Sequence, residues 1–230
     1  MKVELIYHTP LWVCSRAIRR CWSSEDNSDT RKMQEDIGWV LMEDMTVEDF
    51  IEEYGIDPMT LDGHACGPKD RELIHRVGNK NKHKSTLEHL VYTLDIDGIS
   101  RACLQELARH RMASYSVQSS RYTLSKILKD GVEGCYVPTG ITQLDKNVED
   151  ALITIDNSSN IPNDKLKYML PEAMCTSLVW TINARSLQNF LELRSSKSAL
   201  WEIRELAKNV FNALPSEHKY LFRESMYEEM

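Results

Sequence analysis

The stretch Leu90-Val91-Tyr92-Thr93-Leu94-Asp95-Ile96-Asp97-Gly98 carries a large apolar side chain at every second position until Gly98 interrupts it. This period is typical of a strand that buries one face. Residues 99–111 then follow a helical period, and residues 176–182 and 184–194 repeat the order of strand and helix. The regular spacing of a doubly wound parallel sheet is missing, so we predict an α+β fold with a mixed or antiparallel sheet flanked by helices.

The remaining pattern predicts one domain over residues 1–230, in which residues 25–82 form a variable, partly helical region. Residues 2–9 alternate as a strand does, and Thr46-Val47-Glu48-Asp49 is typical of a helix start. We expect loops at 23–29, 55–67 and 112–122, a turn at 136–140, and helices at 11–22, 30–54 in two pieces, 69–77, 146–169 and 199–214.

Composition limits the class of protein. Hydrophobic residues make up 42% and charged residues 27% of the chain, as in ordinary globular proteins. No apolar run approaches the roughly 18 residues that a membrane span needs, and the N-terminus turns polar too early for a signal peptide. We therefore expect a cytoplasmic protein without a membrane partner. Six dispersed cysteines without a C-x-x-C pair argue against a zinc site and for free, mostly buried thiols.

The formal net charge is −7, whereas proteins that bind nucleic acid usually carry a basic surface. Any anionic ligand should therefore be small and held in a pocket. The segment from Arg109 to Tyr122 concentrates the chemistry for this, with three guanidiniums, one imidazole and several hydroxyls. Guanidinium is the preferred donor to phosphate. Consecutive helical residues diverge by about 100°, so Arg109, His110 and Arg111 should reach different ligands or ligand parts. The structural alternative is that these cations only complement a helix dipole.

Three segments in this order resemble the flavin-dependent thymidylate synthases. Arg109-His110-Arg111, seven residues and then Ser119 match the family's R-H-R-x7-S signature. Upstream, residues 83–89 match H-x-[ST]-x-x-E-H, and downstream, residues 183–194 match N-A-R-S-L-x-N-F-L-x-L-R. The resemblance covers about residues 83–210, and residues 1–82 match only loosely.

The resemblance implies an enzyme that methylates dUMP to dTMP. 5,10-Methylenetetrahydrofolate would supply the carbon, and FAD reduced by NADPH would supply the hydride. The family binds FAD across the subunit interfaces of a homotetramer. By resemblance, the FAD-contacting residues are Ser85, Arg109, His110, Arg111, Asn183, Arg185 and Asn189. By resemblance, the dUMP-contacting residues are His83, Gln105, Glu106, Arg109, Gln118, Ser119, Ser120, Arg121, Lys167 and Arg194.

Arg194 is the residue to which the resemblance assigns catalysis, through ionisation of the uracil ring at N3. It continues the apolar stripe of its predicted helix, where a permanent charge is costly without a partner. A fixed cation can stabilise charge that develops in the transition state. The structural alternative is a buried salt bridge with Glu88 or Glu192. For Ser119 we expect a hydrogen bond to the substrate, because no base that could activate it as a nucleophile is visible.

The chain departs from the family pattern at several positions. Val117 stands where many members have Glu, which leaves Gln118 to replace that contact. Ser120 replaces a common Gly, so its backbone should avoid positive φ. Glu106 takes the place of a common Gln, and whether it or Gln105 faces dUMP stays open. Lys167 stands where an Arg often binds phosphate, and it lacks the bidentate fork.

Three other readings remain. The loop could bind single-stranded nucleic acid, with Tyr115 or Tyr122 as a stacking platform, although the acidic charge and the second matching helix speak against this. A cysteine-dependent thymidylate synthase would need an activated thiolate, and none of the six cysteines has a recognisable setting for one. The chain could also be a non-catalytic homologue that serves as a scaffold.

Overall fold

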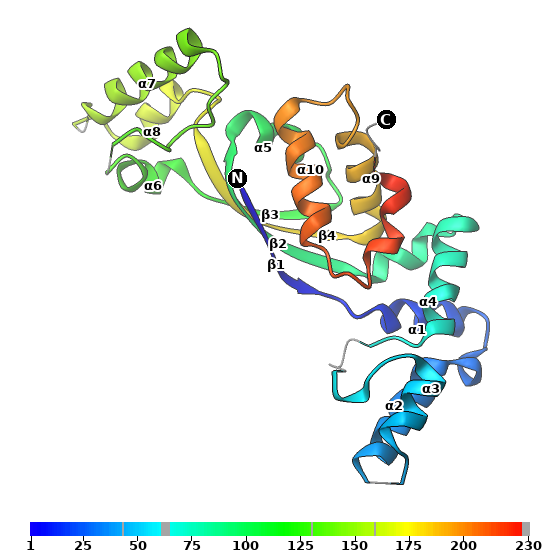
Figure 1. Ribbon diagram of the computed structural model, residues 1–230. Coiled ribbons are helices and arrows are strands. Elements are labelled where there is room, and N and C mark those ends of the chain that lie inside the picture. Colours follow the sequence, from blue (N-terminus) through cyan, green and yellow to red (C-terminus); the bar gives the residue numbers. More distant parts are fainter. Residues whose placement is uncertain (43, 61–64, 130, 159, 227–230) are drawn as a thin grey trace.

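The computed structural model describes residues 1–42, 44–60, 65–129, 131–158 and 160–226. At its centre lies a four-stranded sheet in the order β1-β2-β4-β3, in which every pairing is antiparallel. The strands are β1 (Lys2–His8), β2 (Val91–Ser100), β3 (Ala113–Val117) and β4 (Cys175–Asn183). Helices lie against one face of the sheet and at its two ends (Figure 1). The predicted α+β class is confirmed.

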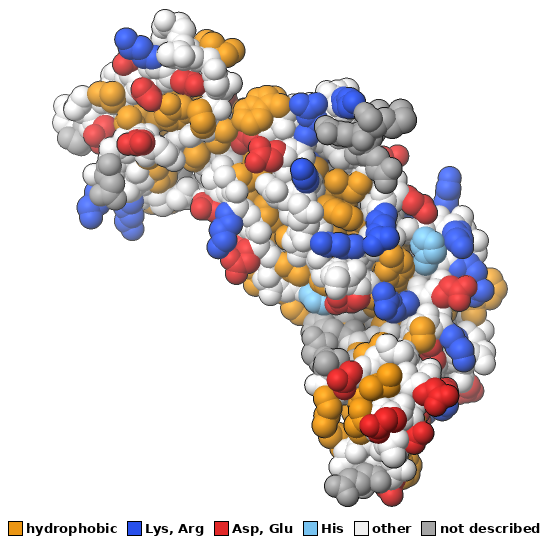
Figure 2. Space-filling view, viewed as in Figure 1, with side chains coloured by type: hydrophobic (Ala, Val, Ile, Leu, Met, Phe, Trp, Pro, Cys, Tyr) orange, Lys and Arg blue, Asp and Glu red, His pale blue; other side chains and the backbone are white. Residues whose placement is uncertain are grey.

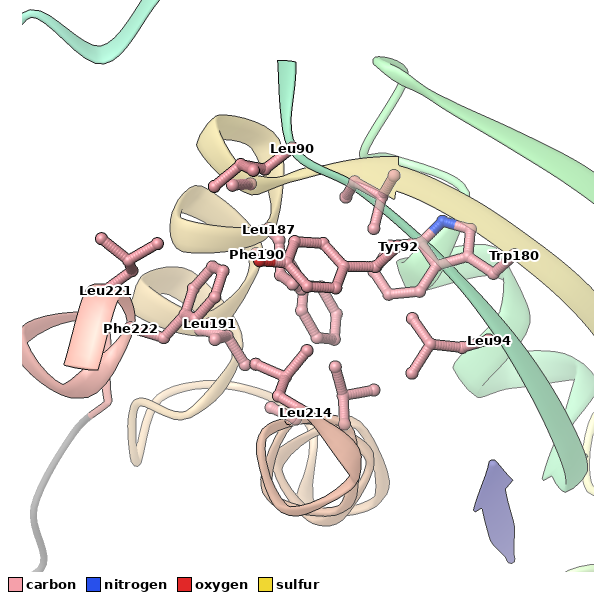
Figure 3. Packing of buried hydrophobic residues seen from close by; sticks show 14 of the residues in the cluster. Leu90, Tyr92, Leu94, Trp180, Leu187, Phe190, Leu191, Leu214, Leu221 and Phe222 are labelled. Atoms are coloured by element: carbon pink, nitrogen blue, oxygen red, sulfur yellow. The ribbon is translucent and has the colours of Figure 1, made fainter. Parts of the chain in front are cut away.

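Helices α9 (Ala184–Arg194) and α10 (Trp201–Ala213) cover one face of this sheet (Figure 1). The period-two pattern buries Tyr92 and Leu94 of β2 and Trp180 of β4 on that face. Figure 3 shows these side chains packed beside Leu187 and Phe190 of α9. Burial of each large side chain is worth roughly 1.5–3 kcal/mol, so this cluster holds α9 firmly against the sheet.

The N-terminal helices form one end of the molecule (Figure 1). They are α1 (Leu11–Cys21), α2 (Asp29–Leu41), α3 (Val47–Tyr54) and α4 (Pro68–Ile74). The predicted start of α3 is confirmed, because the Thr46 hydroxyl accepts the Asp49 N–H at 3.1 Å. The Asp29 carboxylate accepts the N–H groups of Lys69 at 2.7 Å and Asp70 at 3.0 Å, and so caps α4. A Cβ at Gly67 would lie 2.4 Å from Asp29 Cγ, so only glycine fits beside this cap.

The opposite end is a lobe made by α6 (Ser120–Ile127), α7 (Thr142–Asp156) and α8 (Asn163–Leu166) (Figure 1). It has an apolar core of its own, which includes Leu124, Leu152 and Ile155. Figure 2 shows further apolar side chains gathered on its surface. A third, small cluster of Met33, Phe50 and Tyr54 joins α2 and α3. The division of the chain, one domain with a variable region at 25–82, stays a prediction.

Two expectations about the central segment are wrong. The strand at 90–96 does not stop at Gly98, because Gly98 adopts a φ of +72° and forms a bulge after which β2 continues to Ser100. The following helix, α5, is therefore shorter than predicted and covers Arg101–Leu107. Residues 112–122 are not a loop: they contain β3 and the start of α6. Ala113 and Tyr115 alternate with serines, which is a weak strand signal.

The predicted thiol state agrees with the structure. None of the six cysteines, all of which lie in the described ranges, forms a disulfide, and Cys14, Cys66, Cys103 and Cys135 are buried. Within the described ranges, no helix has the length and apolar character to cross a membrane.

Candidate active site

Two connections between strand and helix bring polar side chains together. β4 ends at Asn183, whose Oδ1 accepts the Ser186 N–H at 2.9 Å and so starts α9 directly after the strand. Residues 108–112 link α5 to β3. The Tyr115 hydroxyl fixes this link, because it lies 2.9 Å from the carbonyl oxygen of Leu107 and 2.7 Å from that of His110.

A cavity of about 700 Å³ opens between these two connections. This volume is within the range of sites that hold a cofactor or substrate, roughly 300–1,000 Å³. Its walls combine cations, amides and a few apolar side chains. The lining residues are Glu88, Arg109, His110, Arg111, Met112, Asn183, Arg185, Ser186, Asn189, Leu193 and Arg194.

Arg194, at the end of α9, is held by α5 and by the link that follows it. Its Nη1 lies 2.7 Å from Glu106 Oε2, and its Nη2 donates to the backbone carbonyl of Glu106 at 3.2 Å. Its Nε donates to His110 Nε2 at 3.0 Å. The side chain is only 18% exposed. The structural alternative for Arg194, a salt bridge, is thus present, but its partner is Glu106 and not Glu88 or Glu192.

His110 is a neutral acceptor. Arginine can only donate, so Nε2 of His110 must carry the lone pair and the ring proton must sit on Nδ1. Burial, and then the neighbouring Arg194 guanidinium, lower the pKa of His110 from 6.5 to about 4. The ring also packs edge-on against Phe190 of α9, with centroids 5.1 Å apart. The neutral ring therefore orients Arg194 without adding a second positive charge beside it.

Glu88 pairs with Arg185 instead, at 2.7 Å between Oε1 and Nη1. Both side chains are about half exposed, at 47% and 53%. Exposed ion pairs are worth only about 0–1 kcal/mol, so this pair can open at little cost. Arg185 is therefore available to an anionic ligand in the cavity.

Comparison with known proteins identifies the family. The family model described as "Thymidylate synthase complementing protein" matches residues 4–218. A flavin-dependent thymidylate synthase of Wolinella succinogenes is 48% identical over 96% of this chain and 97% of its own length. The protein of that name from Campylobacter jejuni is 43% identical over the full length of both chains. The chain belongs to the flavin-dependent thymidylate synthases.

Solved structures agree with this membership of the flavin-dependent thymidylate synthases. A crystal structure of thymidylate synthase X (ThyX) from Helicobacter pylori with FAD and dUMP matches with a TM-score of 0.79 and 40% identity. The match covers 99% of this chain and 100% of that one. The fold of the family therefore extends through the described part of residues 1–82, where the sequence motifs match only loosely.

The family-derived residues fall into two groups in this structure. The first group lines the cavity: Arg109, His110, Arg111, Asn183, Arg185, Asn189 and Arg194. Glu106 joins it through Arg194. His83 and Ser85 lie at η4 (Lys84–His89), the 3-10 helix that contributes Glu88 to the cavity wall, although neither residue lines the cavity itself.

The second group lies at the other end of β3. Gln118, Ser119, Ser120 and Arg121 follow that strand, and Lys167 belongs to the same lobe, next to α8. The Asn163 amide of α8 donates to the carbonyl of Arg121 at 3.2 Å. An antiparallel strand rises about 3.4 Å per residue, so the five residues of β3 separate the two groups by roughly 17 Å. The two groups therefore do not share one cavity within a single chain.

Two open points of the sequence reading are answered in part. Gln105 points away from Arg194 and donates to Glu172 at 2.7 Å, whereas Glu106 faces Arg194. Ser120 avoids positive φ as expected, because it is the first residue of helix α6.

Sequence reasoning missed four cavity residues or left them without a role: Glu88, Met112, Ser186 and Leu193. Glu88, Ser186 and Leu193 stand inside the quoted motifs, so those motifs already contained the signal. Met112 directly follows the Arg-His-Arg run and could have been found from its position.

Proposed function

We propose that this protein is a FAD-dependent thymidylate synthase that converts dUMP to dTMP. In this proposal 5,10-methylenetetrahydrofolate donates the carbon and NADPH reduces the flavin. The observation that carries the proposal is the cavity in which the end of α9 meets the Arg109–Met112 link, with Arg194 fixed by Glu106 and His110. The full-length relatives of the same name support it.

The donor set of the cavity fits FAD. Guanidinium groups match a diphosphate, and Arg109, Arg111 and Arg185 all line the cavity. The amides of Asn183 and Asn189 can bond to the polar edge of a flavin ring, and Met112 and Leu193 add apolar contact. In this proposal His110 adds a contact from the cavity wall, and Ser85 adds one from η4, outside the lining residues. When bound, FAD supplies the hydride that completes the methyl group.

The start of α6 suits the phosphate of dUMP. Ser119 is the N-cap residue, and its side chain does not cap the helix. The first N–H groups of a helix have no acceptor within it and favour an anion. Arg121 adds a guanidinium there, and Gln118, Ser120 and Lys167 complete the substrate contacts of this end. Ser119 then serves as a hydrogen-bond donor to the nucleotide.

A second copy of the chain completes the substrate site. Arg194, Arg109 and His83 lie at the far end of β3 from Ser119, so another subunit supplies them to the same dUMP, together with Glu106, which holds Arg194. A substrate site divided between two subunits supports a homo-oligomer, and we propose a tetramer. Light scattering coupled to size-exclusion chromatography measures the number of subunits.

Arg194 acts on the pyrimidine. A guanidinium has five N–H donors, and the three bonds to Glu106 and His110 leave two for the substrate. A cation held at the uracil ring stabilises the negative charge that develops as N3 ionises and the ring becomes nucleophilic. Glu106 and His110 keep this cation in place, so no reorganisation is needed during the reaction.

Other readings fit the molecule less well. Burial raises the pKa of Cys14 and of Cys66 to about 12 and that of Cys175 to about 11, which is unfavourable for a nucleophilic thiolate. The net charge of −7 opposes a nucleic-acid polymer as ligand. Six cysteines without a disulfide are typical of a reducing compartment and support a cytoplasmic enzyme.

One experiment tests the function. FAD-loaded protein is mixed anaerobically with NADPH, dUMP and 5,10-methylenetetrahydrofolate, and dTMP is scored. We expect dTMP only when all four components are present, and the purified protein should show flavin absorbance. If the purified protein is colourless and forms no dTMP after FAD is added, the proposal fails, and the alternative of a non-catalytic scaffold protein is favoured.

A further inference from the structure

A second pocket lies between α1 and α2. Its volume is about 290 Å³, and it shares no residue with the candidate active site. α1 contributes Trp12, Arg16, Arg19 and Arg20, and α2 contributes Arg31 and Gln34. Four guanidiniums on one small concave surface are unusual in a chain whose net charge is −7.

A buried network makes the floor of this pocket rigid. Arg19 is 8% exposed, and its Nε donates to Asp70 Oδ1 at 2.6 Å. The other oxygen of Asp70, which is fully buried, accepts the hydroxyls of Ser28 at 2.7 Å and Ser15 at 3.3 Å. The charge of Arg19 is therefore neutralised within the protein, and its role is to hold α1, α2 and α4 in place.

The other three arginines leave positive charge at the pocket mouth. Arg20 pairs at 2.8 Å with Glu25, a carboxylate that also lines the pocket and is 29% exposed. Arg31 pairs with Glu35 at 3.1 Å, and both arginine side chains are largely exposed, so that these pairs are weak. Arg16 is exposed and has no carboxylate within ion-pair distance among the described residues. The pocket mouth thus carries one guanidinium without a carboxylate partner, that of Arg16, and two whose exposed pairs can open.

We propose that this pocket binds the phosphate ester of a nucleotide. A guanidinium can donate two parallel hydrogen bonds to one phosphate, so Arg16, Arg20 and Arg31 suit this ligand better than lysines would. The Trp12 indole in the same wall offers a flat surface for a base or a sugar. The volume is near the lower limit of ligand sites, roughly 300 Å³, and so suits one nucleotide unit.

The pocket lies one element away from the candidate active site. α1 packs against η4, where Cys14 Sγ contacts the Thr86 carbonyl oxygen at 3.2 Å. Glu88 of η4 lines the active-site cavity. The phosphate can therefore belong to the adenosine part of the dinucleotide reductant, an assignment that rests on the proposed function, or to a free nucleotide.

Calorimetry with a defined probe tests the pocket. FAD-loaded protein saturated with dUMP is titrated with 2′,5′-ADP, with AMP and with inorganic phosphate. We expect one 2′,5′-ADP to bind per chain, and Arg16→Glu to weaken it at least about tenfold, since it replaces a charge-assisted donor with a repelling carboxylate. Arg76→Glu, an exposed arginine outside the pocket, makes the same charge change and should bind as the unchanged protein does.

The absence of binding, or equal binding by the Arg16→Glu variant, would overturn the proposal. Steady-state kinetics distinguish the sources: a higher KM for NADPH at unchanged kcat assigns the pocket to the reductant. If the KM for NADPH is unchanged and AMP binds as tightly as 2′,5′-ADP does, the pocket belongs to a free nucleotide. The dTMP assay on the same preparation keeps the two proposals separate, because Arg16-dependent binding without dTMP formation would contradict only the proposed function.

Discussion

Nη1 of Arg194 lies 2.7 Å from Oε2 of Glu106, although 88 positions separate the two residues in the chain. The backbone carbonyl of Glu106 accepts a second N–H of the same guanidinium. Glu106 stands three positions before the Arg-His-Arg run, where many family members have Gln. The negative charge of Glu106 is therefore already compensated by Arg194, so that it does not repel an anionic substrate as an isolated carboxylate would.

The first prediction concerns Glu106. In Glu106→Gln the amide oxygen can still accept from Arg194, so we expect kcat for dTMP formation to stay within about fivefold of the original. Glu106→Ala removes the acceptor and should lower kcat at least about tenfold, since loss of a charge-assisted bond costs about 1.5–3 kcal/mol. Steady-state kinetics of both variants measure this. An equal loss in both would show that the charge of Glu106, and not its position as acceptor, matters.

The second prediction concerns Arg194 itself. Arg194→Ala should keep FAD, because the other cationic and amide residues of the cavity remain. It should lower kcat about 10²–10³-fold, the usual loss when a donor to developing charge is removed. Flavin absorbance of the purified variant and single-turnover dTMP formation are the two measurements. Arg194→Lys keeps the charge but loses the guanidinium fork, so its kcat should fall between that of the unchanged protein and that of Arg194→Ala. Full turnover by Arg194→Ala would contradict the catalytic assignment.

The third prediction is a pH dependence of stability. The pKa of His110 is 6.5 in an unfolded chain and about 4 in the fold. Between these values the unfolded chain binds a proton at His110 and the folded chain does not, so the free energy of unfolding decreases as pH falls from 6.5 towards 4. We expect a loss on the order of 1–3 kcal/mol. Denaturant unfolding of the protein and of His110→Gln at pH 7 and pH 5 should show a smaller loss in the variant.

Ser119 provides the fourth prediction. Its backbone carbonyl accepts the N–H groups of Tyr122 and Thr123 at 3.0 Å, so it begins α6 whatever its side chain does. Ser119→Ala removes one hydrogen bond to dUMP and should raise KM for dUMP about five- to twentyfold, while dTMP formation continues. A nucleophile would behave differently. Complete loss of single-turnover product in Ser119→Ala, with FAD retained, would favour covalent catalysis.

The sequence was sufficient for the elements whose period is strong. Tyr92 and Leu94 mark β2, and the match at 183–194 places α9 with correct bounds, because an Asn that caps a helix and an apolar stripe are both local signals. β3 was missed because its five residues are short and rich in serine, and its pairing partner β4 lies about 60 positions away. The bulge at Gly98 was missed because a glycine in a strand is compatible with a stop or with a bulge.

For the candidate site, the sequence predicted which residues take part but not which of them contact one another. Nothing local in Glu106 indicates that it faces Arg194, because that contact exists only after α5 and α9 pack on the same sheet. The separation of Arg109 from Ser119 likewise depends on β3 being extended. Pairing between distant elements is a tertiary property, so motifs name the participants and the fold decides which of them meet.

The last prediction concerns the buried floor of the second pocket. Asp70 is fully buried and accepts from Arg19, Ser15 and Ser28. Asp70→Asn leaves the Arg19 guanidinium buried without a counter-charge, and such a change costs about 3–5 kcal/mol. Glu35→Gln breaks the exposed pair with Arg31 and should cost under about 1 kcal/mol. Denaturant unfolding monitored by circular dichroism compares the two, and a loss below 1 kcal/mol in Asp70→Asn would mean that the network does not hold α1, α2 and α4 together.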